Sequence, residues 1–227
     1  DKTVKDYSIS YSLYSNKLYS DENILVEGVA GTVLVSEVKR EGNLSVTTTI
    51  HIDTPKQWSA EAPHRYILVG QLKNNKGEVV ETFSTALGFC KVEIKDTRAD
   101  EDEFGLAGRY FYVNGKPVKL KGVNRQEINP ATGNAISHEQ MQEEIMLMKR
   151  GNINHVRNSH YSCEPYWYYL CDKYGIYLED EANIESHQYY YGKESLSHVS
   201  EFEAAHIARV MELARSHVNH PSIVIWS

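Results

Sequence analysis

Short runs of apolar and polar positions alternate over the first 94 residues. These runs cover residues 24–28, 32–36, 44–52, 66–72 and 78–83. Strands at this spacing, separated by polar turns, are typical of an antiparallel sandwich. We therefore predict an immunoglobulin-like β-sandwich over residues 1–94.

Residues 95–108 differ from this pattern because they are charged and nearly free of apolar side chains. They are predicted to form a linker. A β-hairpin is expected next, with arms over residues 110–113 and 117–123 and a turn at Asn114-Gly115.

The hydrophobic period becomes helical further along the chain. Ser137 is a candidate helix N-cap with Gln140 three residues later, and an apolar stripe at helical spacing runs to Gly151. The stripe consists of Met141, Ile145 and Met148. The remaining predicted elements are a strand over 153–157, a helix over 164–173, a strand over 176–178, a helix over 201–218 and a strand over 223–226.

Alternating strands and helices of this length indicate a parallel α/β arrangement with right-handed crossovers. A closed (β/α)₈ TIM barrel needs about 250 residues. We therefore predict that residues 109–227 are the N-terminal half of a TIM-barrel domain. Either a partner completes this half-barrel, or the chain is an excised piece of a larger protein.

Composition excludes several classes of function. The chain has 24 Lys and Arg against 31 Asp and Glu, a net charge of −7, which disfavours a nucleic-acid partner. No apolar run approaches the roughly 20 residues that span a bilayer, and residues 1–7 lack the features of a signal peptide. We expect no membrane partner, and the compartment, cytoplasmic or periplasmic, stays open. Cys90, Cys163 and Cys171 are interpreted as packing thiols.

Polar residues gather where three predicted parallel strands end, which is where functional residues lie in such barrels. The clusters are residues 124–127, 157–161 and 180–187. Carboxylates and a histidine in the third cluster could hold a hard cation or perform acid/base work. Glu185 and His187 would share a face of an extended loop, although a histidine ligand is unusual for magnesium. A lone histidine such as His160 is more often a structural hydrogen-bonding residue than a metal ligand or a base.

Residues 189–191 are three consecutive tyrosines, which could stack on a sugar ring or pack at a surface. His206, His217 and His220 lie on or after the last predicted helix and indicate no function.

Five separated motifs then show a resemblance to a known family. They are residues 121–127 (KGVNRQE), 156–161 (VRNSHY), 170–175 (LCDKYG), 180–187 (DEANIESH) and 219–227 (NHPSIVIWS). Together they resemble the bacterial glycoside hydrolase family 2 β-galactosidases. In the first domain the resemblance is thinner and is carried by residues 57–66 and by Gly88-Phe89.

This resemblance implies retaining hydrolysis of terminal β-D-galactosides by two glutamates, an acid/base and a nucleophile, with Mg²⁺ beside the acid/base. Glu185 and His187 match the metal ligands. His160 matches a histidine that contacts galactose hydroxyls, and Gln126 and Asn183 are the further candidate substrate-binding residues. Gln126 stands where well-known members have a second histidine, and Cys90 where an arginine is common.

The resemblance also implies that no catalytic residue lies within this chain, because the acid/base is expected just after Ser227 and the nucleophile on a later strand. We expect the chain alone to be inactive, and to hold Mg²⁺ weakly with a third ligand missing. The whole protein is expected to act on a β-galactoside as a homo-oligomer. Two alternatives stay open: a non-catalytic structural or assembly module, and a family 2 hydrolase of a glucuronide or mannoside.

Overall fold

The computed structural model describes residues 3–102, 105–187 and 195–227. The chain forms two compact units, residues 1–56 with 64–89 and residues 57–63 with 90–227. The first unit ends at Phe89, whereas the predicted first domain extends to residue 94. From Cys90 onward the chain belongs to the second unit, because the strand that follows Cys90 pairs with another strand of that unit.

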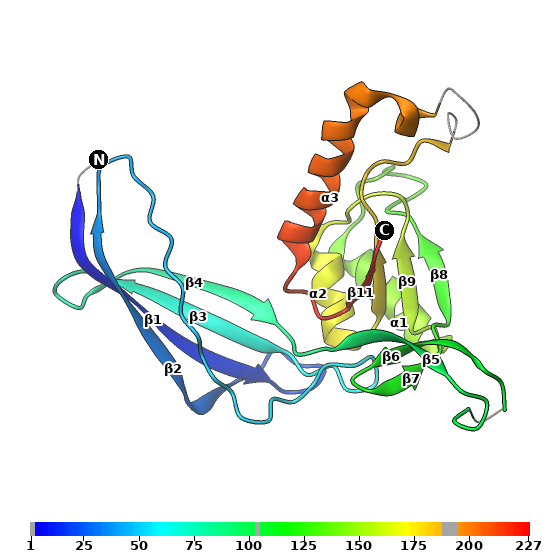
Figure 1. Cartoon of the computed structure of the whole chain (residues 1–227), viewed down its shortest axis with the longest axis horizontal. Helices are drawn as coiled ribbons and strands as arrows, with labels where there is room; N and C mark the ends of the chain where they lie inside the picture. Colours follow the sequence, from blue (N-terminus) through cyan, green and yellow to red (C-terminus); the bar gives the residue numbers. More distant parts are fainter. Residues whose placement is uncertain (1–2, 103–104, 188–194) are drawn as a thin grey trace. The chain divides into compact units, whose positions relative to one another are not determined.

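The first unit is an antiparallel sheet of four strands in the order β2-β1-β3-β4 (Figure 1). The strands are β1 (Val4–Asn16), β2 (Asn23–Val38), β3 (Tyr66–Lys73) and β4 (Val79–Leu87). The runs over residues 24–28 and 32–36 were predicted separately, but both belong to the single strand β2.

Residues 44–52, predicted as a strand, form none. Their side chains, among them Val46 and Ile50, instead line a cavity of about 460 Å³ together with Leu13 and Leu68 of the sheet. This segment therefore meets the sheet through apolar side chains and not through a backbone ladder. Apolar β-branched composition alone does not distinguish these two arrangements.

The second unit opens with a small antiparallel sheet of β5 (Val92–Thr97), β6 (Gly108–Val113) and β7 (Lys116–Val118). The predicted hairpin and its turn are confirmed, and the turn residues Asn114 and Gly115 both have positive φ, 52° and 77°. Asn-Gly is favoured in such turns because both residues tolerate the left-handed region. The predicted second arm was too long, because residues 122 and 123 belong to a separate parallel sheet. The predicted linker is wrong over residues 95–97, which lie in β5 and pair with β6.

A parallel sheet in the order β11-β10-β9-β8 forms the main part of this unit (Figure 1). Its strands are β8 (Gly122–Arg125), β9 (His155–Asn158), β10 (Tyr177–Asp180) and β11 (Ile223–Trp226). The helical elements are α1 (His138–Arg150), α2 (Pro165–Tyr174), the 3₁₀ turns η3 (Leu196–His198) and η4 (Ser200–Phe202), and α3 (Glu203–His217). The predicted alternation of strands and helices is confirmed.

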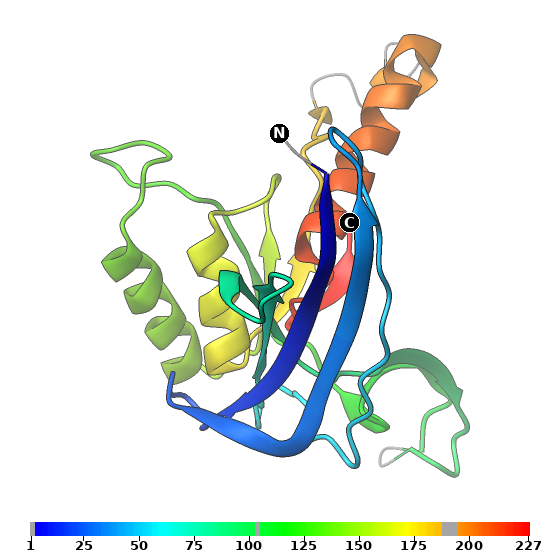
Figure 2. The same ribbon diagram turned by 90° about the vertical axis from the view of Figure 1, so that its left-hand side faces the viewer.

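Helix α1 begins as its sequence predicts. The Ser137 hydroxyl accepts a hydrogen bond from the Gln140 amide at 3.2 Å, which satisfies one of the free N–H groups at the helix start. The apolar stripe of α1 is buried, and α1 lies beside α2 (Figure 2). Among the described residues, no helix is long and apolar enough to cross a bilayer.

The two faces of the parallel sheet have different cores. Val156 and Leu178 pack with Ile145 of α1 and Trp167 of α2. Tyr177, one residue before Leu178, packs in a separate cluster around Trp58, because successive residues of a strand point to opposite faces. Burying each large apolar side chain contributes about 1.5–3 kcal/mol, so these helices fix the strand ends in place.

A tight contact holds the end of α2. Gly175 caps this helix in the left-handed conformation at φ 74°, which glycine adopts without steric cost. A Cβ there would lie 2.2 Å from the Ala60 carbonyl oxygen. Any side chain at this position would therefore displace the Ala60 backbone.

Candidate functional site

The register of the parallel sheet aligns three polar side chains. Asn124 of β8 pairs with Arg157 of β9, which pairs with Glu179 of β10. Val156 and Leu178 pack against the helices, so Arg157 and Glu179 lie on the opposite face of the sheet. The row therefore crosses the face that the helices leave uncovered.

Arg157 connects the members of this row. Its Nη1 donates to Asn124 Oδ1 at 3.3 Å, and its Nε lies 3.6 Å from Glu179 Oε1. Its Nη2 forms a 2.5 Å ion pair with Glu181 Oε2, just beyond β10. The planar guanidinium suits this role because it presents several donors in a fixed geometry.

His160 joins the same group. Its Nδ1 lies 2.7 Å from Glu181 Oε1 and 3.2 Å from Arg157 Nη2. The His160 side chain is 35% exposed, whereas that of Glu181 is 10% exposed. The structure thus combines a buried carboxylate, a guanidinium and a partly exposed imidazole at the C-terminal end of the sheet.

A second polar network lies on the helix side of the same strand end. The fully buried Asp180 accepts hydrogen bonds from Asn158 Nδ2 at 3.1 Å and the Tyr168 hydroxyl at 2.7 Å. His217 Nδ1 lies 2.7 Å from the other carboxylate oxygen. Burial, and then the Asp180 charge, raise the pKa of Tyr168, which keeps its proton on the hydroxyl. Asp180 therefore stabilises the strand end and Glu181 faces the site.

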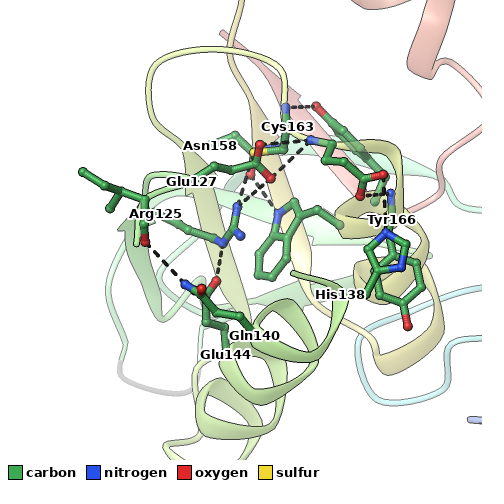
Figure 3. A network of polar contacts seen from close by, with 12 residues as sticks. Arg125, Glu127, His138, Gln140, Glu144, Asn158, Cys163 and Tyr166 are labelled. Atoms are coloured by element: carbon green, nitrogen blue, oxygen red, sulfur yellow. Dashed lines mark hydrogen bonds and ion pairs between the residues drawn. The ribbon is translucent and has the colours of Figure 1, made fainter. Parts of the chain in front are cut away.

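Arg125 forms a third network, between β8 and the helices (Figure 3). Its Nε donates to Glu144 Oε2 at 2.7 Å, and its guanidinium lies 3.7 Å from the Trp167 ring centroid. Burial opposes its charge, but the hydrogen bond from Arg125 to Glu144 and the nearby negative charges outweigh it and raise its pKa. Glu127 also accepts from the Glu164 amide at 3.2 Å. This network positions the β8 end and the start of α2.

The predicted substrate-binding residues are not all brought together. Gln126 and Asn183 are both exposed. No hydrogen bond links either of them to His160 within the described part of the chain. Asn183 instead lines a polar pocket of about 330 Å³ with Ser162, Arg209 and His217 among its other residues. Of the three candidates, the structure places only His160 in the Arg157–Glu181 group.

The predicted metal ligands lie together in the loop after β10. Both side chains are exposed, and Glu185 Oε1 accepts a hydrogen bond from the His187 amide at 2.7 Å. A carboxylate and an imidazole suit a divalent cation, but among the described residues no three potential ligands gather into one group. The residues that the structure describes therefore bring together at most a partial metal site. The tyrosines at 189–191 lie outside the described residues.

Sequence reasoning gave no roles to Arg157, Glu179 and Glu181, although two of them lay in the predicted clusters. The sequence signal that could have identified Arg157 and Glu179 is the alternation of side-chain direction along β9 and β10, which places residues 157 and 179 on one face of the sheet. No local pattern identified Glu144 as the partner of Arg125, because this contact depends on how α1 packs.

Comparisons with known proteins agree over both units. Residues 2–89 match the family model described as glycosyl hydrolases family 2, and residues 104–227 match its TIM barrel domain. A β-galactosidase of Photobacterium profundum is 40% identical over 80% of this chain and 16% of its own length. One of Priestia megaterium is 36% identical over 96% of this chain and 21% of its own length. The chain therefore spans about a fifth or less of these relatives.

Solved structures show the same fold at lower identity. The crystal structure of a Bacteroides uniformis β-glucuronidase superposes with a TM-score of 0.76 at 21% identity, over 99% of this chain and 24% of that one. A β-glucuronidase from Ruminococcus gnavus gives a TM-score of 0.69 at 20% identity, over 100% of this chain and 36% of that one. At this identity the likeness is one of fold and carries no information on substrate.

Proposed function

Because the chain belongs to glycoside hydrolase family 2, we propose that the whole protein is a retaining β-galactosidase and that this chain carries part of its sugar site. The observation that carries the proposal is the 40% identity to a protein named β-galactosidase, over a region that includes the site. The β-glucuronidase structures stand at 20–21% identity. The motif 180–187 (DEANIESH), which resembles the galactosidases, contains Glu181.

In this proposal the chain binds and orients the sugar. His160 hydrogen-bonds a sugar hydroxyl, and Gln126 and Asn183 supply further polar contacts when substrate is bound. Arg157, held by Asn124 and Glu179, keeps a fixed positive charge at the same end of the sheet. Because positive charge develops on the sugar ring during the reaction, the role of Arg157 in this proposal is to hold the Glu181 carboxylate in place, and not to stabilise that charge directly.

The two glutamates of the retaining reaction would come from the part of the relatives that this chain does not span. One would act as the acid/base and the other as the nucleophile that forms a galactosyl-enzyme. We propose that Glu185 and His187 supply two ligands of a Mg²⁺ ion, whose charge would favour the ionised form of nearby acidic groups. The finer architecture, an immunoglobulin-like sandwich followed by the first half of the barrel, belongs to the same proposal.

A substrate panel tests the proposed specificity. The whole protein is given nitrophenyl β-galactoside, β-glucuronide and β-mannoside at equal concentrations, and the 227-residue chain alone is the matched control. We expect kcat/KM to be highest for the galactoside and no turnover by the chain alone. A preference for the glucuronide or mannoside would overturn the proposed substrate. Turnover by the chain alone would overturn the placement of the catalytic glutamates.

A further inference from the structure

We infer that Glu181 is a positioning residue that fixes the His160 ring with its proton on Nδ1, so that Nε2 is a hydrogen-bond acceptor for the substrate. The geometric part rests on this chain alone. The part about substrate rests on the proposed function.

The tautomer follows from the chemistry of the two neighbours of Nδ1. A carboxylate only accepts hydrogen bonds, and Glu181 Oε1 lies 2.7 Å from His160 Nδ1. A bare Nδ1 would place its lone pair against that of the carboxylate. Since a neutral imidazole carries one proton, the proton is on Nδ1, and Nε2 has a free lone pair.

Arg157 contributes by holding Glu181 in place. Its Nη2 pairs with the second carboxylate oxygen at 2.5 Å, so the two oxygens of Glu181 have different partners. Arg157 Nη2 also lies 3.2 Å from Nδ1, but a donor facing a donor adds no hydrogen bond. With its own position fixed by Asn124 and Glu179, Arg157 holds the Glu181 carboxylate beside His160.

Glu181 and His160 differ in how far their side chains are exposed to solvent. Glu181 is 7% exposed as a residue and points inward, whereas the side chain of His160 is 35% exposed. No hydrogen bond within the described residues uses His160 Nε2. The buried carboxylate therefore leaves one defined acceptor at the surface, and a sugar hydroxyl can donate to it.

Nitrogen NMR of the 227-residue chain, labelled with ¹⁵N-histidine, tests the tautomer without any need for activity. The spectra are recorded at a pH where the imidazoles are neutral, and the His160 signals are identified by their loss in His160→Gln. We expect a pyrrole-type shift for Nδ1 and a pyridine-type shift for Nε2. The reverse pattern in the wild-type chain would overturn the inference.

Two variants test whether Glu181 is the cause. In Glu181→Gln, Arg157 takes the amide oxygen and the NH₂ group faces Nδ1, so we expect the proton to move to Nε2. In Glu181→Ala, the His160 ring should show the same preference between its two tautomers as a free imidazole in water. Glu185→Gln, in the same loop but without contact to His160, is the matched control and should leave the His160 signals unchanged. An unchanged His160 tautomer in Glu181→Gln would overturn the inference. Glutamine is nearly the same size as glutamate, so this variant still provides the test if Glu181→Ala does not fold.

Kinetics of the whole protein then test the consequence for substrate. Loss of a hydrogen bond in a charged network costs about 1.5–3 kcal/mol, so we expect kcat/KM for the galactoside to fall about 10- to 100-fold in Glu181→Gln. Because Glu181 acts through His160, the double variant with His160→Gln should be little worse than His160→Gln alone. Full additivity of the two losses in kcat/KM would overturn the positioning role. If instead the proposed function is wrong, the wild type will show no turnover of the galactoside while the NMR result remains as expected.

Discussion

His217 Nδ1 lies 2.7 Å from Asp180 Oδ2, and this contact ties the last helix to the strand end that carries the site. Asp180 is fully buried, and its other oxygen accepts hydrogen bonds from Asn158 and Tyr168. Strand β9 and helices α2 and α3 thus meet at one carboxylate. The residue after it in the chain, Glu181, contacts His160.

We predict that Asp180→Ala destabilises the second unit strongly. Removing the carboxylate leaves buried donors without an acceptor, which typically costs about 3–5 kcal/mol of unfolding free energy. Urea unfolding followed by helical circular dichroism measures this, because the described helices all lie in that unit. Asp100→Ala, which removes an exposed partner of Arg98, is the control and should cost about 0–1 kcal/mol. Equal losses in the two variants would contradict this account.

Arg125 offers a similar comparison among arginines. Its side chain is 4% exposed, pairs with Glu144 and stacks on Trp167. Arg125→Ala should lower the unfolding free energy by about 3–5 kcal/mol, since it removes the partner of a part-buried carboxylate and leaves space beside a buried ring. Arg109→Ala breaks an ion pair to Asp96 in which the Arg109 side chain is 72% exposed, and it should change the unfolding free energy far less than Arg125→Ala does. A small loss in Arg125→Ala would mean that the network in Figure 3 contributes little.

The stability of the second unit should depend on pH through His220. Burial disfavours the charged ring, but the hydrogen bond and charge of Asp172 outweigh burial and raise the pKa above 6.5. A raised folded-state pKa gives a stabilisation that is full below the unfolded value of about 6.5 and is lost as the pH rises through the folded value.

The difference in unfolding free energy between wild type and His220→Gln should therefore shrink between about pH 6 and pH 8. Taking this difference cancels the opposite contribution of His155, whose pKa is lowered by burial. The prediction is checked by urea titrations of both proteins at several pH values. A constant or growing difference would show that the Asp172–His220 contact does not raise the pKa.

Metal dependence tests Glu185. If Glu185 and His187 hold Mg²⁺ in the whole protein, Glu185→Gln should raise the Mg²⁺ concentration needed for half-maximal activity about 10- to 100-fold. Ser186→Ala changes the residue between the two proposed ligands and should leave that concentration unchanged. Activity that is insensitive to both chelator and Glu185→Gln would rule out this role.

Some elements could be predicted from the sequence because local physics determines them. Ser137 and the stripe of Met141, Ile145 and Met148 specify α1, and Asn114-Gly115 specifies the hairpin turn. Strand β11 was likewise predicted at its observed bounds. For the helix start and the hairpin turn, neighbouring residues decide the conformation, whereas β11 also needs its pairing with β10.

Other features depend on contacts between distant residues. Residues 44–52 have a strand-like composition, but the position of their pairing partners decides whether they form a ladder. The same holds for β5, whose charged residues 95–97 are strand only because β6 pairs with them. At the site, the motif 180–187 was found from its residues, whereas the contact between Glu181 and His160 requires the register of β9 against β10.

The central claim, that the whole protein hydrolyses β-galactosides with retention, is tested most directly by following the first product by proton NMR. The whole protein is mixed with nitrophenyl β-galactoside, and the anomeric signals of the released galactose are recorded before mutarotation. Two successive displacements predict that β-galactose appears first and α-galactose only later. Initial release of α-galactose, or no hydrolysis of the galactoside, would contradict the account.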